Sequence, residues 1–156
     1  MKKILIIFLF FFTTSQAEKV ERLGFYNIQE LLEDDNLTYK IIKNCVSLNS
    51  AITEITKENH PELSKSFFET ANYLYPFGIL TLAKIKKLSY QDVEKEYLNN
   101  VSAKTSDYME FMKKNGTTNQ SFIKGTFIGD DLNFCNEIRS AIEITISETK
   151  KLKSQD

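Results

Sequence analysis

Two cysteines and a single histidine are the residues best suited to covalent or metal chemistry in this chain of 156 residues. A nucleophile needs an activating base and commonly an orienting group. His60 supplies the only imidazole, beside Pro61, where a helix is expected to start. Zinc sites built from Cys and His need about four ligands, which Cys45, Cys135 and His60 do not supply. We therefore expect His60 to be a surface turn residue, and we expect neither a metal site nor a bound cofactor.

Paired aspartates are the other candidates for chemistry, because two carboxylates can share the acid and base roles in a glycoside hydrolase. The pairs Asp34-Asp35 and Asp130-Asp131 both stand where a helix is expected to begin. Aspartates in that position cap the first turn and favour the positive end of the helix dipole. We interpret both pairs as caps and keep an envelope hydrolase that uses Asp or Glu as an alternative. The sequence contains no phosphate-loop, dinucleotide-binding or nucleophile-elbow string.

Aromatic and apolar residues gather in two segments that could bind an apolar ligand or a protein partner. The candidate binding residues are Tyr73, Tyr75, Phe77, Phe122, Phe127 and Ile128. The first three adjoin Pro76 and Gly78, where a kink or a short interruption is expected to open space between helices. The other three lie in a long connection, and long loops on a rigid scaffold commonly carry binding. Two interpretations stay open: one binding surface built from both segments, or side chains that cover the core.

The beginning of the chain has the three-part order of a secretory signal peptide. Two lysines precede an apolar run at residues 4–12, and small residues lead up to Ala17. A bilayer span needs roughly 20 apolar residues, so we predict a cleaved leader at residues 1–17. The remaining residues 18–156 are then expected to be a periplasmic or secreted protein with no stable membrane span.

The predicted location of the protein decides how its two cysteines are interpreted. In an oxidising compartment an even pair of cysteines is most simply interpreted as a disulfide, here Cys45–Cys135, with two separate buried thiols as the alternative. Residues 18–156 also fall within the usual size of a single domain. The formal net charge of the chain is −1, which argues against a nucleic-acid partner, because phosphates call for a basic face.

The elements that must position these residues are helices, because apolar residues recur at three- and four-residue steps without sustained alternation. Long helices are expected at residues 37–58, 61–87, 89–114 and about 130–153, after a short helix within residues 18–35. Asn115-Gly116 is interpreted as a helix stop, and residues 117–129 as a long connection. We predict an all-α fold: a single four- to five-helix bundle-like domain whose disulfide joins the first and last long helices.

A series of short motifs carries a resemblance to known proteins. The pattern Y-x5-C-x-x-L runs from Tyr39 to Leu48, a Tyr-Met pair precedes Asn115-Gly116, and D-D-L-x-x-C runs from Asp130 to Cys135. This order resembles small secreted two-cysteine helical proteins of proteobacteria that carry no assigned function. The resemblance implies a helical fold and a periplasmic address, and it transfers no active site.

We predict a noncatalytic exported protein that binds an unknown protein partner or an apolar ligand. An immunity or inhibitor protein against a secreted toxin fits the size and the compartment equally well. The envelope hydrolase introduced above is the third hypothesis, and a buried carboxylate pair that lines a cleft would favour it.

Overall fold

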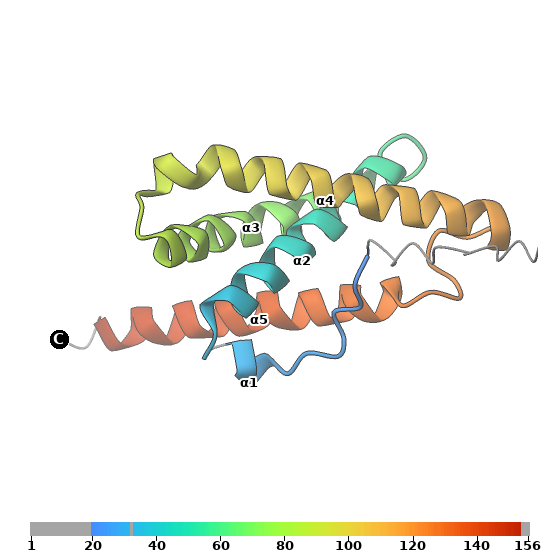
Figure 1. Cartoon of the computed structure of the whole chain (residues 1–156). Helices are drawn as coiled ribbons and strands as arrows, with labels where there is room; N and C mark the ends of the chain where they lie inside the picture. Colours follow the sequence, from blue (N-terminus) through green and yellow to red (C-terminus); the bar gives the residue numbers. More distant parts are fainter. Residues whose placement is uncertain (1–19, 32, 154–156) are drawn as a thin grey trace, which may run out of the picture.

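The computed structural model describes residues 20–31 and 33–153, so the predicted leader lies outside the described residues. In chain order the helices are α1 (Ile28–Leu31), α2 (Asp35–Thr56), α3 (Pro61–Lys86), α4 (Tyr90–Asn119) and α5 (Ile128–Lys153). No strand occurs in these ranges, which confirms the predicted all-α class (Figure 1). Within the same two ranges, no helix is both long enough and apolar enough to cross a membrane.

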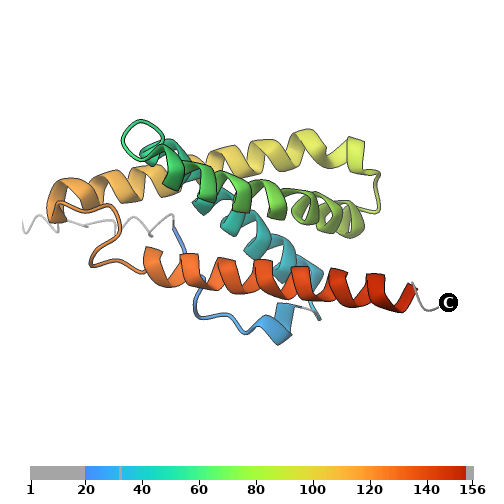
Figure 2. The ribbon, with the colours of Figure 1, turned by 180° about the vertical axis from the view of Figure 1, so that it is seen from behind.

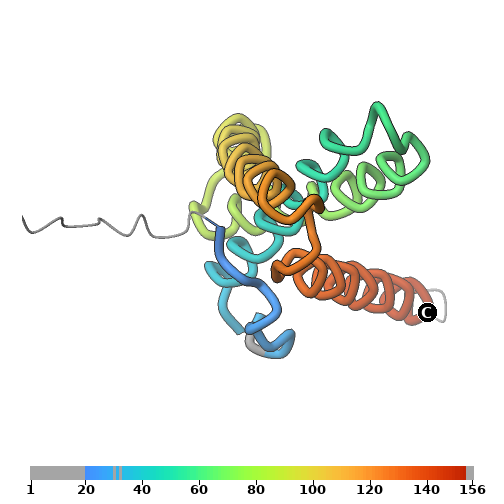
Figure 3. The backbone as a smooth tube through the Cα atoms, turned by 90° about the vertical axis from the view of Figure 1, so that its right-hand side faces the viewer, coloured from blue at the N-terminus to red at the C-terminus, as the bar shows by residue number. Residues whose placement is uncertain are grey.

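The central helix of the fold is α2, which contacts each of the other helices. Figure 3 shows α3, α4 and α5 spreading outward from it. The predicted apolar stripe of α2 is buried at Ile41, Cys45, Leu48 and Ile52 and half-buried at Ile55. The periodicity of the sequence therefore identified the face of this helix that packs against the rest of the core.

Two polar residues of α2, Ser47 and Asn49, are buried as well, and their side chains bond to nearby backbone. The Ser47 hydroxyl donates to the carbonyl of Lys43 at 2.8 Å and to that of Val101 on α4 at 3.2 Å. The Asn49 amide donates to the Cys45 carbonyl at 2.9 Å. Small polar side chains that bond to the backbone in this way can be enclosed without a large desolvation penalty. Neighbouring helices therefore surround α2 on more than its apolar face.

At Pro76 and Gly78 the sequence predicted a kink or a short interruption. The interruption is wrong, because α3 runs without a break through both residues. Gly78 instead allows the ring of Tyr97 on α4 to lie against α3, since a Cβ added at Gly78 would be 1.9 Å from the Tyr97 hydroxyl oxygen. Phe68 and Leu80 of this helix are each about half exposed.

The predicted helix stop at Asn115-Gly116 is also wrong, because α4 continues to Asn119 and ends where Gln120 takes a left-handed φ of 55°. The ring of Phe122 folds back onto Gly116, where an added Cβ would lie 2.8 Å from a ring carbon. The Asn115 amide donates to two carbonyls of the following loop, at 2.7 and 3.1 Å. These two residues therefore hold the loop against the helix.

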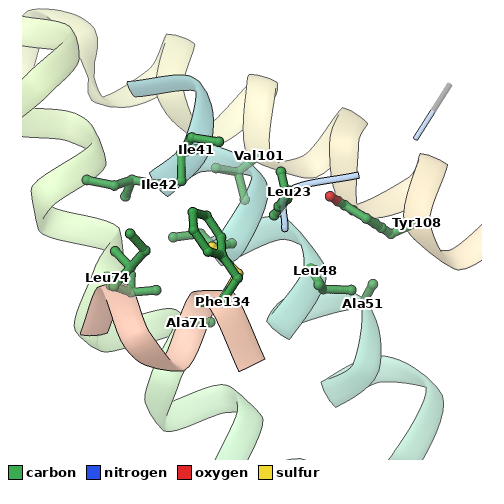
Figure 4. Packing of buried hydrophobic residues seen from close by; sticks show 14 of the residues in the cluster. Leu23, Ile41, Ile42, Leu48, Ala51, Ala71, Leu74, Val101, Tyr108 and Phe134 are labelled. Atoms are coloured by element: carbon green, nitrogen blue, oxygen red, sulfur yellow. A yellow bond between two sulfur atoms is a disulfide. The ribbon is translucent and has the colours of Figure 1, made fainter. Parts of the chain in front are cut away.

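The predicted disulfide between Cys45 on α2 and Cys135 on α5 is confirmed, and both cysteines are fully buried. Figure 4 shows the core around it, with side chains from every long helix and from the N-terminal segment. Residues 20–27, called the strap below, run to α1 without forming a helix (Figure 1). Figure 2 shows the connection between α4 and α5 at one end of the molecule.

Candidate functional site

The six predicted binding residues lie in separate parts of the molecule. The ring of Tyr75 contacts Tyr97 on α4, with ring centroids 5.1 Å apart. The ring of Phe127 contacts Phe111 on the same helix, with centroids 5.2 Å apart. Tyr97 and Phe111 are about four helical turns apart, which is about 20 Å along α4. The two segments therefore do not meet on α4 as one surface.

The other predicted binding residues have different environments. Tyr73 is half-buried, and the Arg139 guanidinium of α5 lies 5.1 Å from its ring centroid. Phe77 is 5.7 Å from Tyr73, again between ring centroids. Ile128 is fully buried and belongs to the core. Phe122 is 45% exposed and lines a shallow hollow of about 440 Å³ together with Lys113 and Gly116.

A larger groove, of about 610 Å³, opens where the end of α4 meets the α4–α5 loop, the strap and the start of α5. It is lined by Arg22, Phe111, Lys114, Asn115, Thr118, Asn119, Gly125, Thr126, Phe127 and Asp130. The volume falls within the range of small-molecule sites. Of the six predicted binding residues, Phe127 alone is part of this lining.

The groove combines an apolar wall with charged groups. Phe111 and Phe127 form the wall. The Arg22 guanidinium donates to the Asp130 carboxylate at 2.7 Å, and both side chains are accessible to solvent. The Lys114 ammonium has no hydrogen bond or ion pair with any residue that the structure describes. The groove therefore presents one positive charge that no carboxylate neutralises, close to two aromatic rings.

One side of the groove is held in place by a buried carboxylate. Asp131 Oδ1 accepts the backbone N–H of Leu23 at 2.8 Å and that of Gly24 at 3.1 Å. Asp131 and Leu23 are both fully buried. Asp131 Oδ2 is also buried, and it has no hydrogen-bond partner among the described residues. This carboxylate fastens the strap, and with it Arg22, to the start of α5.

Burial has the largest effect on the pKa values of Asp131 and Tyr108. It raises the pKa of Asp131 to about 6, against the lowering effect of the two backbone N–H groups and of Arg22. Burial also raises the pKa of Tyr108, and the charges of Asp131 and Glu21 raise it further. Figure 4 shows the Tyr108 hydroxyl directed toward the strap segment that carries Leu23. Asp131 and Tyr108 are thus both buried, and the charge of one affects the proton affinity of the other without a hydrogen bond between them.

The remaining candidates for chemistry have structural roles. His60 is exposed and precedes α3, as predicted for a surface turn residue. Asp34 caps α2, as predicted, by accepting two backbone N–H groups. Asp130 and Asp131 were predicted to be caps, but they lie inside the first turn of α5 and bind the strap. Within residues 20–31 and 33–153, no group of three or more His, Cys, Asp or Glu side chains could hold a metal ion.

Sequence reasoning missed most of the groove. Arg22 and Asp130 are separated by 108 positions in the chain, and no local pattern relates them. Lys114 and Asn115 were assigned to a helix end, where lysine and asparagine are common for reasons unrelated to binding. The available signal was the long connection predicted at residues 117–129, which identified Phe127, although the observed connection is shorter, residues 120–127.

No protein-family model, curated protein sequence or solved structure matches this chain.

Proposed function

We propose that the mature protein is an exported, noncatalytic protein that binds, in the groove, a ligand with an apolar part and an acidic group. The observation that supports this most directly is the unneutralised Lys114 ammonium beside the Phe111–Phe127 pair. Aromatic rings offer apolar surface to a ligand, and an ammonium forms a charge-assisted hydrogen bond with a carboxylate. A small organic acid or the carboxyl end of a peptide has both features.

Export is the part of this proposal that concerns the address of the protein. Its support is the disulfide, fully buried at both cysteines, because such bonds persist mainly in oxidising compartments. The order of charged, apolar and small residues at positions 1–17 adds to it. A periplasmic or secreted location accommodates both features.

A noncatalytic role is favoured over a carboxylate-dependent hydrolase by the positions of the aspartates. Such an enzyme needs two carboxyl groups that flank the bond to be cut. Asp130 lines the groove, but its carboxylate is paired with Arg22. Asp131 is fully buried and holds strap backbone, so it does not face a ligand in the groove. Asp34 is a helix cap, and Asp35 pairs with Lys84 at 2.7 Å.

The test is a titration of the oxidised protein, residues 18–156, followed through its backbone amide NMR signals. The probes are N-acetyl-L-phenylalanine, which carries a carboxylate, and N-acetyl-L-phenylalaninamide, its neutral counterpart. We expect the acid to shift the amide signals of Gly125, Thr126 and Phe127, with a dissociation constant in the millimolar range for a ligand of this size. The amide should bind more weakly by about two- to fivefold, the value of an exposed ion pair.

A matched pair of lysine variants identifies the charge responsible. Lys114→Gln should weaken binding of the acid by the same factor and leave the neutral amide unaffected. Lys113→Gln is the control, because Lys113 lines the hollow beside Phe122 and not the groove. Equal binding of the acid by Lys114→Gln and the parent would contradict the assigned role of Lys114. The absence of shifts at residues 125–127 with either probe at about 10 mM, roughly tenfold above a dissociation constant of 1 mM, would contradict the groove itself.

A further inference from the structure

The strap forms one wall of the groove, and its attachment depends on Asp131. Arg22 is the strap residue in the lining. The next two residues, Leu23 and Gly24, donate their backbone N–H groups to Asp131 Oδ1. Because Asp131 is fully buried under the strap, movement of the strap away from α5 would bring this carboxylate into water. The same movement would take Arg22 out of the groove.

No cation among the described residues forms an ion pair with the Asp131 carboxylate. The charged and titratable groups that face it are Arg22 on the strap, Asp130 on α5 and Tyr108 on α4. The Arg22 guanidinium donates to Asp130, and its Nε is buried without a hydrogen-bond partner among the described residues. Asp131 Oδ2 and the Tyr108 hydroxyl lack such a partner as well. An ionised carboxylate is costly in this setting, whereas a protonated one is tolerated.

We propose that the strap is a proton-controlled wall of the groove, closed while Asp131 is protonated and released when Asp131 ionises. The consequence for ligand binding rests on the proposed function of the groove. The opening of the strap does not, because it concerns the contacts of residues 20–27 with α5 and α2 and no ligand.

The direction of the effect follows from where the proton binds more tightly. With the strap closed, burial raises the pKa of Asp131 to about 6 from the ordinary value of 3.8. With the strap open, the carboxylate is solvated and its pKa returns toward the ordinary value. Opening is therefore rarest below pH 4, rises about tenfold per pH unit between pH 4 and 6, and levels off above pH 6. The full change is about 100-fold.

A second ion pair of the strap has the opposite effect on how strap attachment depends on pH. Lys40 on α2 pairs with Glu21 at 2.8 Å, so ionisation of Glu21 fastens the strap. A variant that removes only the Asp131 titration separates the two effects. Asp131→Asn retains a carbonyl oxygen for the amides of Leu23 and Gly24 and cannot ionise between pH 4 and 7.

The experiment is amide hydrogen exchange by NMR on the oxidised protein from pH 4 to 7, with each rate divided by the intrinsic rate of that amide. In the parent, protection of Leu23 and Gly24 should fall by about 100-fold, mostly between pH 4 and 6. In Asp131→Asn this fall should disappear. A 13C titration of the Asp131 carboxyl group should have a midpoint near pH 6 in the parent.

Asp34→Asn is the matched control, because Asp34 also accepts two backbone N–H groups, those of Asn36 and Leu37, but its carboxylate is exposed. This variant should retain the parent's exchange profile at the strap. Constant protection of Leu23 and Gly24 from pH 4 to 7 in the parent would overturn the proposal, as would a fall that persists in Asp131→Asn. If Asp131→Asn does not fold, a carboxyl midpoint near pH 4 in the parent overturns it as well. Neither result decides the proposed function, because binding of the acid and amide probes in the groove is measured separately.

Discussion

The disulfide offers the sharpest test of how this fold is stabilised, because its expected contribution can be calculated from its place in the chain. Cys45 and Cys135 are 90 residues apart. In the chain-entropy model, releasing a loop of that length costs about 4.6 kcal/mol at 25 °C. With an unfolding entropy of about 2.1 cal/mol/K per residue for roughly 140 residues, this corresponds to a decrease in melting temperature of about 15 °C.

The measurement is urea unfolding followed by circular dichroism, first on the oxidised and then on the reduced parent protein. Reduction opens the loop but leaves both sulfur atoms in the core. It therefore measures the contribution of loop closure to the free energy of unfolding separately from the loss of core packing. The variant with Cys45→Ala and Cys135→Ala also removes two buried sulfur atoms, and it should lose about 1–2 kcal/mol more than the reduced parent. The slope of unfolding free energy against urea should increase in both, because an unfolded chain without a cross-link exposes more surface.

Two results would refute this reasoning. A free energy of unfolding that falls by less than about 1 kcal/mol on reduction would mean that the loop constraint does not govern stability. Alkylation of both cysteines in the native, unreduced protein, detected by intact mass, would mean that the bond does not form at all.

Three further predictions concern single positions. Gly78→Ala should lower the free energy of unfolding by about 1–3 kcal/mol, because the new methyl group overlaps the Tyr97 ring; an unchanged urea midpoint would show that the ring moves aside freely. His60→Ala should change stability by less than about 0.5 kcal/mol, since His60 is exposed and its side chain makes no capping bond; a larger loss would reveal a buried partner. Asp131 binds its proton more tightly in the folded protein, so its stabilising contribution is complete below pH 4 and is lost as pH rises through 6. The free energy of unfolding of the parent relative to Asp131→Asn should therefore fall by up to about 3 kcal/mol between pH 4 and 7, and a rise would contradict the sign.

Features that depend on neighbouring residues could be predicted from the sequence. Ser89 and Asp92 are three positions apart, and they form a reciprocal cap of α4 of the kind that local sequence indicates, although aspartate stands where glutamate is usual. The capping role of Asp34 has the same local origin. The pairing of Cys45 with Cys135 was predictable for a different reason, because two cysteines allow a single intramolecular bond.

Features that depend on tertiary contacts were not predictable. Gly116 was interpreted as a helix end, but its use is to receive the Phe122 ring, which the sequence places in the following loop. Gly78 was interpreted as part of an interruption, whereas it makes room for an aromatic ring from another helix. Asp131 bonds to backbone 108 positions away, and backbone N–H groups leave no mark in a sequence. The strap, its attachment to Asp131 and most of the groove could therefore be identified only in the three-dimensional structure.

If the chain is exported as proposed, the position of the strap also determines the order in which the structure is completed. Residues 20–27 would then leave the translocation channel first, directly behind the predicted leader. The carboxylates of α5 that hold the strap, Asp130 and Asp131, would follow much later. The first residues to emerge would thus be among the last to dock, and until α5 has emerged, Val20 and Leu23 would expose side chains that the finished protein buries. During that interval the strap would be open to chaperones and proteases.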